Sequence, residues 1–443
     1  MTLADDTITA IATPAGYSGV AVVRVSGDLA KIIIAKYIKN FKARHSYYIK
    51  LTDINNDLID DGLMVFFPGP NSYTGEDTLE FYGHGNPVLL KKTINYFIDL
   101  GCRLAEAGEF TKRAYLNNKL DLVQAEAVMD IINAQSDFAL RAARRNLQGE
   151  FSALIKQLEK QILTCRMWVE AAIDFSDQAI DDQGNSYYVK QLNNLYEDIL
   201  KIIARADNGY KALQTFTMVL IGPPNAGKSS LFNYLCNKDA AIVDSQAGTT
   251  RDVLEQQLNI NGINCTLLDT AGLRTTANAV EQQGIKRAIA AVESADLIVV
   301  LYDASSKTDA KTFWQDNLPC KLDPDRTLFC WNKVDLVESF NQDKQLGISI
   351  KNEINLEKFK QQILHMLGIN NKSLQDMIPA QYRHIKLLQE TKEYIEIAKQ
   401  DIFQLDLLAE NLKLAHQSLA KIYGDSNYDI VLDQIFSNFC IGK

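Results

Sequence analysis

Four short motifs in the middle of the chain have the residue types and spacing that bind a guanine nucleotide. They are Gly222 to Ser229, which fits the pattern G-x-x-x-x-G-K-S, the pair Thr249 and Thr250, the segment Asp269 to Gly272 with the sequence DTAG, and the segment Asn332 to Asp335 with the sequence NKVD. Backbone N–H groups of a glycine-rich loop converge on phosphate at the start of a helix, where the helix dipole also favours negative charge. The order of the motifs predicts a GTP site.

Particular side chains of these motifs have expected roles. Lys228 is expected to reach the β- and γ-phosphates, and Ser229 to ligate Mg²⁺. Asp269 follows an apolar segment, a position from which a carboxylate holds Mg²⁺ through water, and the N–H of Gly272 can meet the γ-phosphate. Asp335 can accept hydrogen bonds from the ring N–H and the 2-amino group of guanine. Adenine lacks that amino donor, so Asp335 favours GTP over ATP.

The residues expected around the nucleotide belong to these motifs and to the segments beside them. They are Asn225, Ala226, Gly227, Lys228, Ser229, Ser230, Asp244, Ser245, Gln246, Ala247, Gly248, Thr249, Thr250, Asp269, Thr270, Ala271, Gly272, Asn332, Lys333, Val334, Asp335 and Ser349. Leu273 stands where Ras-like switches carry a water-orienting glutamine, so hydrolysis needs another organiser. The nearby candidates are Arg274, Glu281 and a cation held by Asn225, while a solvated helix face is the alternative reading for Glu281.

Length and composition indicate a multidomain protein. The chain has 443 residues, of which 47% are hydrophobic and 23% are charged, and a formal net charge of −9. The length suits two or three domains, and the negative charge argues against broad electrostatic capture of nucleic acid. Without an apolar run near the ~18 residues that span a bilayer, and with an acidic N-terminus, we expect a cytoplasmic protein with no membrane association. The cysteines form no C-x-x-C pair, so a zinc site or disulfide framework is not expected.

Changes in apolar periodicity divide the chain into segments. Residues 1–118 mix alternating apolar segments with Gly and Pro turns, which is typical of an α+β domain. Residues 119–213 and 373–443 have apolar residues at helical spacing, and residues 214–372 contain the nucleotide motifs. The economical interpretation is one helical domain formed from two segments, with a Ras-like α/β P-loop GTPase domain inserted between them.

Further segments, most of them outside the nucleotide motifs, are specific enough to indicate a family. They are Asp6 to Pro14, Pro68 to Asp77, Gly83 to Gly85, Gly108 to Asn117, Lys119 to Ala127, Ala247 to Asp252 and Cys440 to Lys443. With these segments the chain resembles, from end to end, the MnmE (TrmE) family of tRNA-modification GTPases. The resemblance implies a potassium-activated GTP hydrolase whose N-terminal domains form a homodimer and bind 5-formyl- or 5,10-methylene-tetrahydrofolate at their interface. It also implies a heterotetramer with the flavoprotein MnmG, which adds an aminomethyl or carboxymethylaminomethyl group at C5 of the wobble uridine of certain tRNAs.

The resemblance implies roles for individual residues as well. The folate contacts match Arg24, Glu80, Lys119 and Lys443, the potassium ligands match Asn225, Asp244, Gln246 and Thr249, and the Mg²⁺ ligands match Ser229 and Thr250. Basic side chains can pair with the folate glutamate tail, and a carboxylate can accept from the pterin N–H edge. The potassium ion would supply the charge that an arginine finger gives elsewhere, and Glu281 would orient the attacking water.

Some positions depart from the family pattern or leave alternatives open. Pro223 stands where an arginine is frequent and the loop from Asp244 to Gln246 is unusual, so the strength of potassium dependence stays open. Ile350 replaces an alanine behind guanine, where its N–H can still contact the base but its bulkier side chain can weaken binding. Cys440 is either a folate-adjacent nucleophile or a packed thiol. Three arginines, Arg141, Arg144 and Arg145, either contact tRNA phosphates or solvate a helix face.

Two other functions fit the same motifs. The chain would be a pure regulatory switch for RNA or ribosome assembly if folate does not bind, or mainly a folate-dependent one-carbon enzyme if GTP hydrolysis is dispensable. The sequence does not reveal which tRNAs are modified, whether ammonium or glycine supplies the amine, or which step hydrolysis drives.

Overall fold

The computed structural model describes most of the chain and divides it into two compact units. The described residues are 6–174, 182–239, 255–268, 290–306, 322–338, 340, 345–369, 377–424, 435–437 and 439–442, without the side chains of 182–188 and 255. The first unit comprises Met1–Met129, Asn146–Glu159 and His416–Lys443, and the second comprises Asp130–Arg145 and Lys160–Ala415.

The first unit is built on a six-stranded sheet with the strand order β3-β4-β5-β2-β1-β6. Its strands are β1 (Ile8–Ile11), β2 (Ser18–Ser26), β3 (Ser46–Thr52), β4 (Leu58–Phe67), β5 (Thr78–Gly85) and β6 (Arg103–Leu104). Neighbouring strands pair antiparallel, except that β1 and β6 pair parallel. This is the α+β domain predicted from the sequence.

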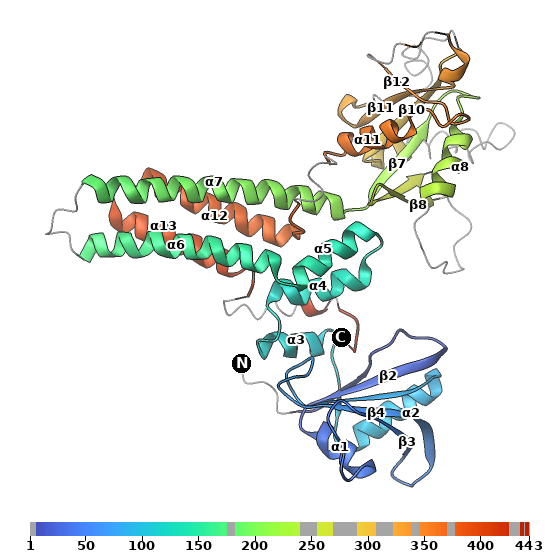
Figure 1. Ribbon diagram of the computed structural model, residues 1–443, viewed down its shortest axis with the longest axis vertical. Coiled ribbons are helices and arrows are strands. Elements are labelled where there is room, and N and C mark those ends of the chain that lie inside the picture. The colour runs from blue at the N-terminus through green and yellow to red at the C-terminus, as the bar shows by residue number, and fades with distance from the viewer. Residues whose placement is uncertain are drawn as a thin grey trace. The chain divides into compact units, whose positions relative to one another are not determined.

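The two faces of this sheet have different coverings. Helices α1 (Leu29–Tyr37) and α2 (Pro87–Asp99) cover one face, where Val23, Val25 and Phe81 belong to their core (Figure 1). Because successive side chains of a strand point to opposite faces, Arg24 and Glu80 lie on the other face. There, Phe110 of helix α3 (Glu109–Leu116) packs with residues of β1.

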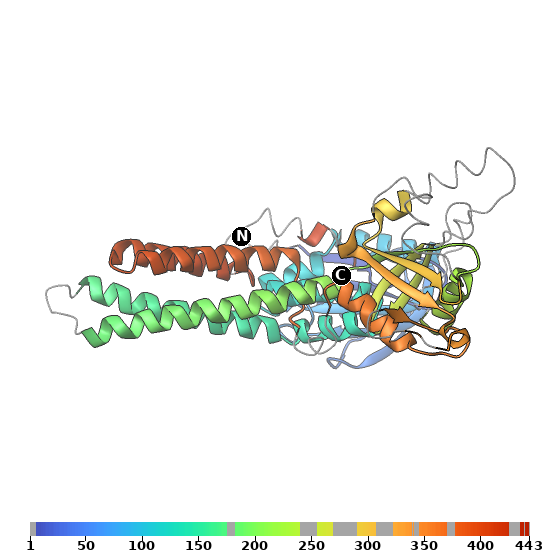
Figure 2. The same cartoon turned by 90° about the horizontal axis from the view of Figure 1, so that it is seen from above.

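The helical part of the chain combines two distant stretches of sequence. Its long helices α6 (Glu150–Asp174), α7 (Asp182–Leu213), α12 (Tyr382–Gln400) and α13 (Leu405–Ala420) run side by side in both views (Figures 1 and 2). Their buried residues recur at spacings of three and four, such as Leu192, Leu195 and Ile199 on α7. Shorter helices, α4 (Leu122–Asn133) and α5 (Asp137–Leu147), precede α6. One helical domain formed from two segments was predicted, and the structure confirms it.

Between these two stretches lies a six-stranded sheet with the order β12-β11-β10-β7-β9-β8. Its strands are β7 (Phe216–Ile221), β8 (Glu255–Ile260), β9 (Ile263–Leu268), β10 (Leu297–Asp303), β11 (Thr327–Asn332) and β12 (Leu346–Gly347). Only the β8–β9 pair is antiparallel. Helices α8 (Lys228–Asp239) and α11 (Leu356–Met366) pack on one face, and residues before β10 pack on the other. Burial on both faces explains the continuous apolar run in β10.

A close backbone contact holds the end of α7 against the segment that leads into α12. The N–H of Ile378 donates to the carbonyl of Arg205 at 3.2 Å. A Cβ at Gly209 would lie 1.9 Å from the carbonyl oxygen of Ile378. Gly209 therefore leaves space that the returning chain occupies.

We expect Gly209→Ala to destabilise the protein, although alanine within a helix is ordinarily about 1 kcal/mol better than glycine. The overlap with Ile378 has to be relieved by moving backbone, and overpacking of this kind costs roughly 1–3 kcal/mol. Urea unfolding followed by circular dichroism should show a lower midpoint than in wild type. Asn208→Ala, one residue earlier in the same helix, is the control and should keep or slightly raise the wild-type midpoint, because alanine is the better helix former. Equal stability of both variants would contradict the close contact.

Candidate functional site

The phosphate-binding motif forms the turn between β7 and α8. Its backbone passes close to neighbouring groups, because a Cβ at Gly222 would lie 2.3 Å from the Leu301 carbonyl oxygen and one at Gly227 would lie 2.2 Å from Nδ2 of Asn332. The ammonium group of Lys228 donates to the carbonyls of Gly222 at 2.6 Å and Pro223 at 2.9 Å. The lysine therefore lies over the loop that is predicted to hold the phosphates.

Several side chains of the phosphate loop and of the first turn of α8 are exposed to solvent. Asn225 has a positive φ of 64° and is exposed, and Ser229 and Ser230 in the first turn of α8 are also exposed. A hydroxyl and an amide oxygen at these places are suitable ligands for hard cations. Ala226, in contrast, is fully buried beneath the loop.

A buried amide joins the phosphate loop to the motif predicted to read guanine. Asn332, at the end of β11 and 4% exposed, donates from Nδ2 to the Ala226 carbonyl at 2.9 Å. Its Oδ1 accepts from the N–H of Ile350 at 3.4 Å. Asn332 thus connects three segments that are distant in sequence and fixes the loop against the edge of the sheet.

The remaining residues of this motif lie beside Asn332. Lys333 pairs with Asp303 at 2.6 Å, and Val334 and Asp335 begin a 3-10 helix, Val334–Leu336. Ser349 is buried, and its hydroxyl accepts from the N–H of Asn352 at 3.2 Å. The structure therefore brings the NKVD motif, Ser349 and the phosphate loop together at the carboxyl ends of parallel strands, where such folds bind ligands.

Sequence reasoning missed Asp303. Burial alone would raise the pKa of this carboxyl, but hydrogen bonds from Lys333 and Ser305 outweigh burial and hold its pKa below the ordinary value. Asp303 is directly paired with Asn332 in the β10–β11 register. The sequence does contain a signal for Asp303, since a charged residue stands directly at the end of the apolar run of β10.

Several predicted site residues lie outside the described part of the chain. They are Asp244, Ser245, Gln246, Ala247, Gly248, Thr249, Thr250, Asp269, Thr270, Ala271, Gly272, Arg274, Glu281 and Lys443. Their roles stay predictions.

The first unit presents a second polar group. Arg24 on β2 and Glu80 on β5 are direct partners in the strand register, and Nε of Arg24 lies 2.8 Å from Oε1 of Glu80. The guanidinium lies over the rings of Tyr73 at 5.5 Å and Phe110 at 5.6 Å. Tyr82 donates its hydroxyl to the other oxygen of Glu80, and burial together with this bond raises the pKa of Tyr82 to about 12. The carboxylate is therefore held on both sides.

Lys119 lies on a neighbouring loop. Its ammonium donates to the Pro70 carbonyl at 2.9 Å, so it contacts the same loop that carries Tyr73. No hydrogen bond joins Lys119 to Arg24 or Glu80 within the described residues.

The segment 439–442 packs on the same unit. Ile441 forms an antiparallel bridge with Ala107, and Cys440 is exposed. Gly442 has a φ of 100°, and a Cβ there would lie 2.0 Å from the Ile11 carbonyl oxygen. The segment therefore ends beside β1, the strand that pairs with β2 next to Arg24.

One group of carboxylates and a histidine has the spacing of metal ligands within the described residues: Asp60, Asp61 and His84. The Asp60 carboxylate already accepts from the N–H groups of Asp61 and His84, at 2.9 and 2.8 Å, and its Oδ1 lies 2.7 Å from Nδ1 of His84. The hydrogen bond to Asp60 raises the pKa of His84. These bonds make Asp60 a partner of His84, and we assign no metal here.

With this geometry in place, comparison with known proteins identifies the family. The model of the GTP-binding protein TrmE N-terminus matches residues 7–119, and that of the MnmE helical domain matches residues 122–440. The tRNA modification GTPase MnmE of Francisella philomiragia subsp. philomiragia is 40% identical over 449 residues, covering 99% of each chain. Its counterpart in Francisella tularensis subsp. novicida is 39% identical over 451 residues, again covering 99% of each. The chain belongs to the MnmE family of tRNA modification GTPases.

Family membership confirms the predicted resemblance, the multidomain fold class and GTP hydrolysis as the enzyme class. Among solved structures, the G domain of T. maritima FeoB aligns with a TM-score of 0.27 and 19% identity, covering 34% of this chain and 99% of that chain. None of the helices in the described ranges has both the length and the apolar composition needed to cross a membrane.

We expect Asn332→Ala to weaken nucleotide binding. The substitution leaves the carbonyl of Ala226 and the N–H of Ile350 without their buried partner, which costs about 1–3 kcal/mol, or roughly 5- to 150-fold in the dissociation constant. Titration with a fluorescent GDP analogue measures this constant. The control is Glu338→Ala, a change at an exposed residue after the same motif. Unchanged affinity in Asn332→Ala would contradict the role of Asn332 in joining the phosphate loop to Ile350.

Proposed function

We propose that this GTPase uses the energy of GTP hydrolysis in a reaction that adds an aminomethyl or carboxymethylaminomethyl group at C5 of the wobble uridine of certain tRNAs. It acts as a homodimer with the flavoprotein MnmG and takes the one-carbon unit from a folate. The observation that carries the proposal is the pairing of Arg24 with Glu80 on the face of the N-terminal sheet opposite α1 and α2, in a chain that also carries the nucleotide motifs. Because the substrate is tRNA, we place the activity in the cytoplasm.

The nucleotide side of the proposal assigns each motif a task. Lys228 contacts the β- and γ-phosphates, Asp335 selects guanine, and Ser229 with Thr250 holds Mg²⁺ beside water bound by Asp269. The exposed amide of Asn225 supports a potassium site that Asp244, Gln246 and Thr249 would complete. When bound, potassium supplies positive charge beside the phosphates. The water-orienting group is Glu281, with Arg274 nearby in sequence.

The fit of a folate to the N-terminal unit follows from the donor set. Within the described residues, the hydrogen bond of the Arg24 side chain to Glu80 uses Nε, which leaves its terminal nitrogens suited to a carboxylate or carbonyl of a ligand. Glu80 can accept from a pterin N–H edge. Lys119 and Lys443 would meet the glutamate tail. Cys440, exposed beside Ala107, stays open as nucleophile or packed thiol.

Potassium dependence is the first test. With purified protein at a concentration that permits dimerisation, GTP turnover should be much faster in potassium than in sodium buffer, by at least tenfold if the cation replaces an arginine finger. Asn225→Ala should remove the acceleration while leaving GDP affinity near wild type. Equal turnover in both buffers would point to an external activating partner instead.

The link between hydrolysis and tRNA modification is the second test. Asp269→Asn should retain folate binding but lose modification of tRNA in a mixture that contains MnmG, because the water-mediated Mg²⁺ contact is weakened. Retained modification would make hydrolysis ancillary and favour the one-carbon enzyme. Absence of folate binding in wild type would favour the regulatory switch.

A further inference from the structure

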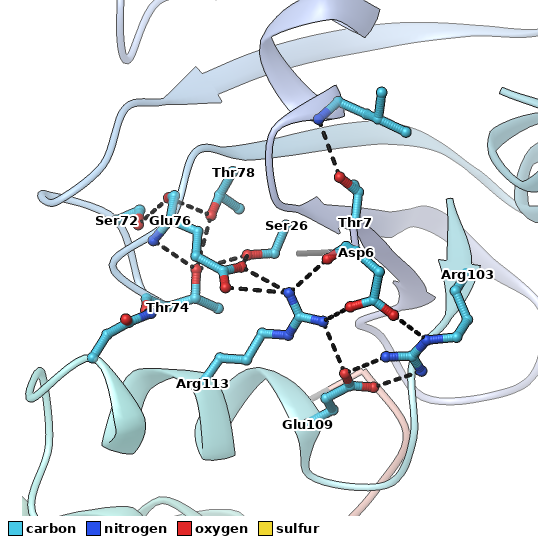
Figure 3. Close-up of polar contacts among 12 residues, drawn as sticks. Asp6, Thr7, Ser26, Ser72, Thr74, Glu76, Thr78, Arg103, Glu109 and Arg113 are labelled. Atoms are coloured by element: carbon cyan, nitrogen blue, oxygen red, sulfur yellow. Dashed lines mark hydrogen bonds and ion pairs between the residues drawn. The ribbon is translucent and has the colours of Figure 1, made fainter. Parts of the chain in front are cut away.

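A cluster of charged side chains joins the beginning of the described chain, β6, helix α3 and the loop before β5. Its members are Asp6, Glu76, Arg103, Glu109 and Arg113 (Figure 3). Arg113 lies at the centre and its side chain is 5% exposed. A guanidinium has five donors in a fixed fork, so its partners are held in defined directions.

Arg113 uses both terminal nitrogens. One donates to the carbonyl of Asp6 at 2.9 Å and to the two oxygens of Glu76 at 3.2 and 3.3 Å. The other donates to the Asp6 carboxylate at 2.7 Å and to Glu109 at 3.0 Å. Arg103 shares two of these partners, Asp6 and Glu109, but makes no described contact with Glu76. Arg113 is thus the member of the cluster that reaches the loop.

Glu76 connects this cluster to the strand that carries Arg24. Its carboxylate accepts from the hydroxyl of Ser26 at 2.6 Å, and Ser26 follows Arg24 by two residues on the same face of β2. The hydroxyls of Ser26 and Thr74 are 2.7 Å apart. Two residues of the loop 68–77, Thr74 and Glu76, are therefore both hydrogen-bonded to Ser26 of β2.

The end of α3 holds the same loop from its other side. The amide of Asn117 donates to the Thr74 carbonyl at 2.7 Å, and Lys119 donates to that of Pro70. Tyr73 lies between these attachments, with its hydroxyl 2.8 Å from that of Thr111 on α3. The aromatic ring of Tyr73 is thereby placed at the Arg24 guanidinium while the residue keeps 36% of its surface exposed.

We propose that Tyr73 forms an aromatic wall of the ligand site at Arg24 and Glu80, against which the flat pterin ring of a folate stacks, and that Arg113 is the positioning residue that holds this wall in place through Glu76. The inference rests on the proposed function, because it takes the ligand to be a folate. Offset stacking on an aromatic ring suits a planar heterocycle whose polar edge is bound by neighbouring charges.

The test compares two arginines of one cluster. Arg113→Lys keeps a positive charge but loses the fork that reaches Glu76, whereas Arg103→Lys perturbs the same cluster away from the loop. Affinity for 5-formyl-tetrahydrofolate, measured by calorimetry on the full chain, should fall about tenfold in Arg113→Lys and in Tyr73→Leu. Arg103→Lys should stay within about twofold of wild type, since it leaves the contact of Arg113 with Glu76 in place.

A double variant separates positioning from general loss of stability. If Arg113 acts through Tyr73, the variant with both Arg113→Lys and Tyr73→Leu should bind no more weakly than the weaker single variant, because coupled residues are not additive. Additive losses, or equal losses in Arg113→Lys and Arg103→Lys, would overturn the positioning role. If Arg113→Lys does not fold, Glu76→Gln takes its place in the cycle.

Hydrogen exchange of the ligand-free protein gives a readout that needs no folate. Amides of residues 71–77 should exchange faster in Arg113→Lys than in Arg103→Lys or wild type. If Arg113→Lys exchanges faster but the wild-type protein binds no folate, the proposed function and the stacking role both fail, while the attachment of the loop by Arg113 is upheld. Folate binding in wild type with unchanged exchange and affinity in Arg113→Lys would defeat the inference alone.

Discussion

The helical domain depends on burying apolar faces that neither of its two segments can cover alone. Helices α6 and α7 present buried residues at helical spacing, and α12 and α13 return from beyond the nucleotide-binding sheet to pack beside them. This requirement brings together the two ends of the inserted sheet. Ala212, Ile369 and Met377, which flank it in sequence, pack in one cluster with Phe216 at the start of β7. The insertion is therefore anchored by the same packing that completes the bundle.

In both candidate sites, the register of neighbouring strands places two polar side chains next to each other. In the nucleotide-binding sheet, a glycine also leaves room for one of them. In the nucleotide-binding sheet, Asp303 and Asn332 are paired at the ends of adjacent strands, and Gly227 leaves space for the Asn332 amide. In the N-terminal sheet, Arg24 and Glu80 are paired in the same way. The polar groups differ, but in each case the hydrogen-bonded backbone sets the separation of two polar side chains before any ligand is present.

The sequence predicted the parts of these sites that depend on local pattern. The phosphate loop, the NKVD motif and the helical spacing of each of the two bundle segments follow from patterns within short windows, and the structure places the described residues of the first two together. Asp303 was missed because its importance lies in a pairing with Lys333, which directly follows another strand, β11. The Arg113 cluster was missed for the same reason, since Asp6, Glu76 and Arg113 are distant in sequence and each is an ordinary charged residue by itself.

The bridge between Ala107 and Ile441 also affects the order in which the N-terminal unit folds during synthesis. Domains usually fold in order during synthesis, N-terminal domain first. Here the N-terminal sheet emerges early, but the segment that packs on Ile11 and Ala107 is translated only after the helical and nucleotide-binding parts. During synthesis, the surface of the N-terminal unit at Ile11 and Ala107 is therefore uncovered until the segment 439–442 has been translated.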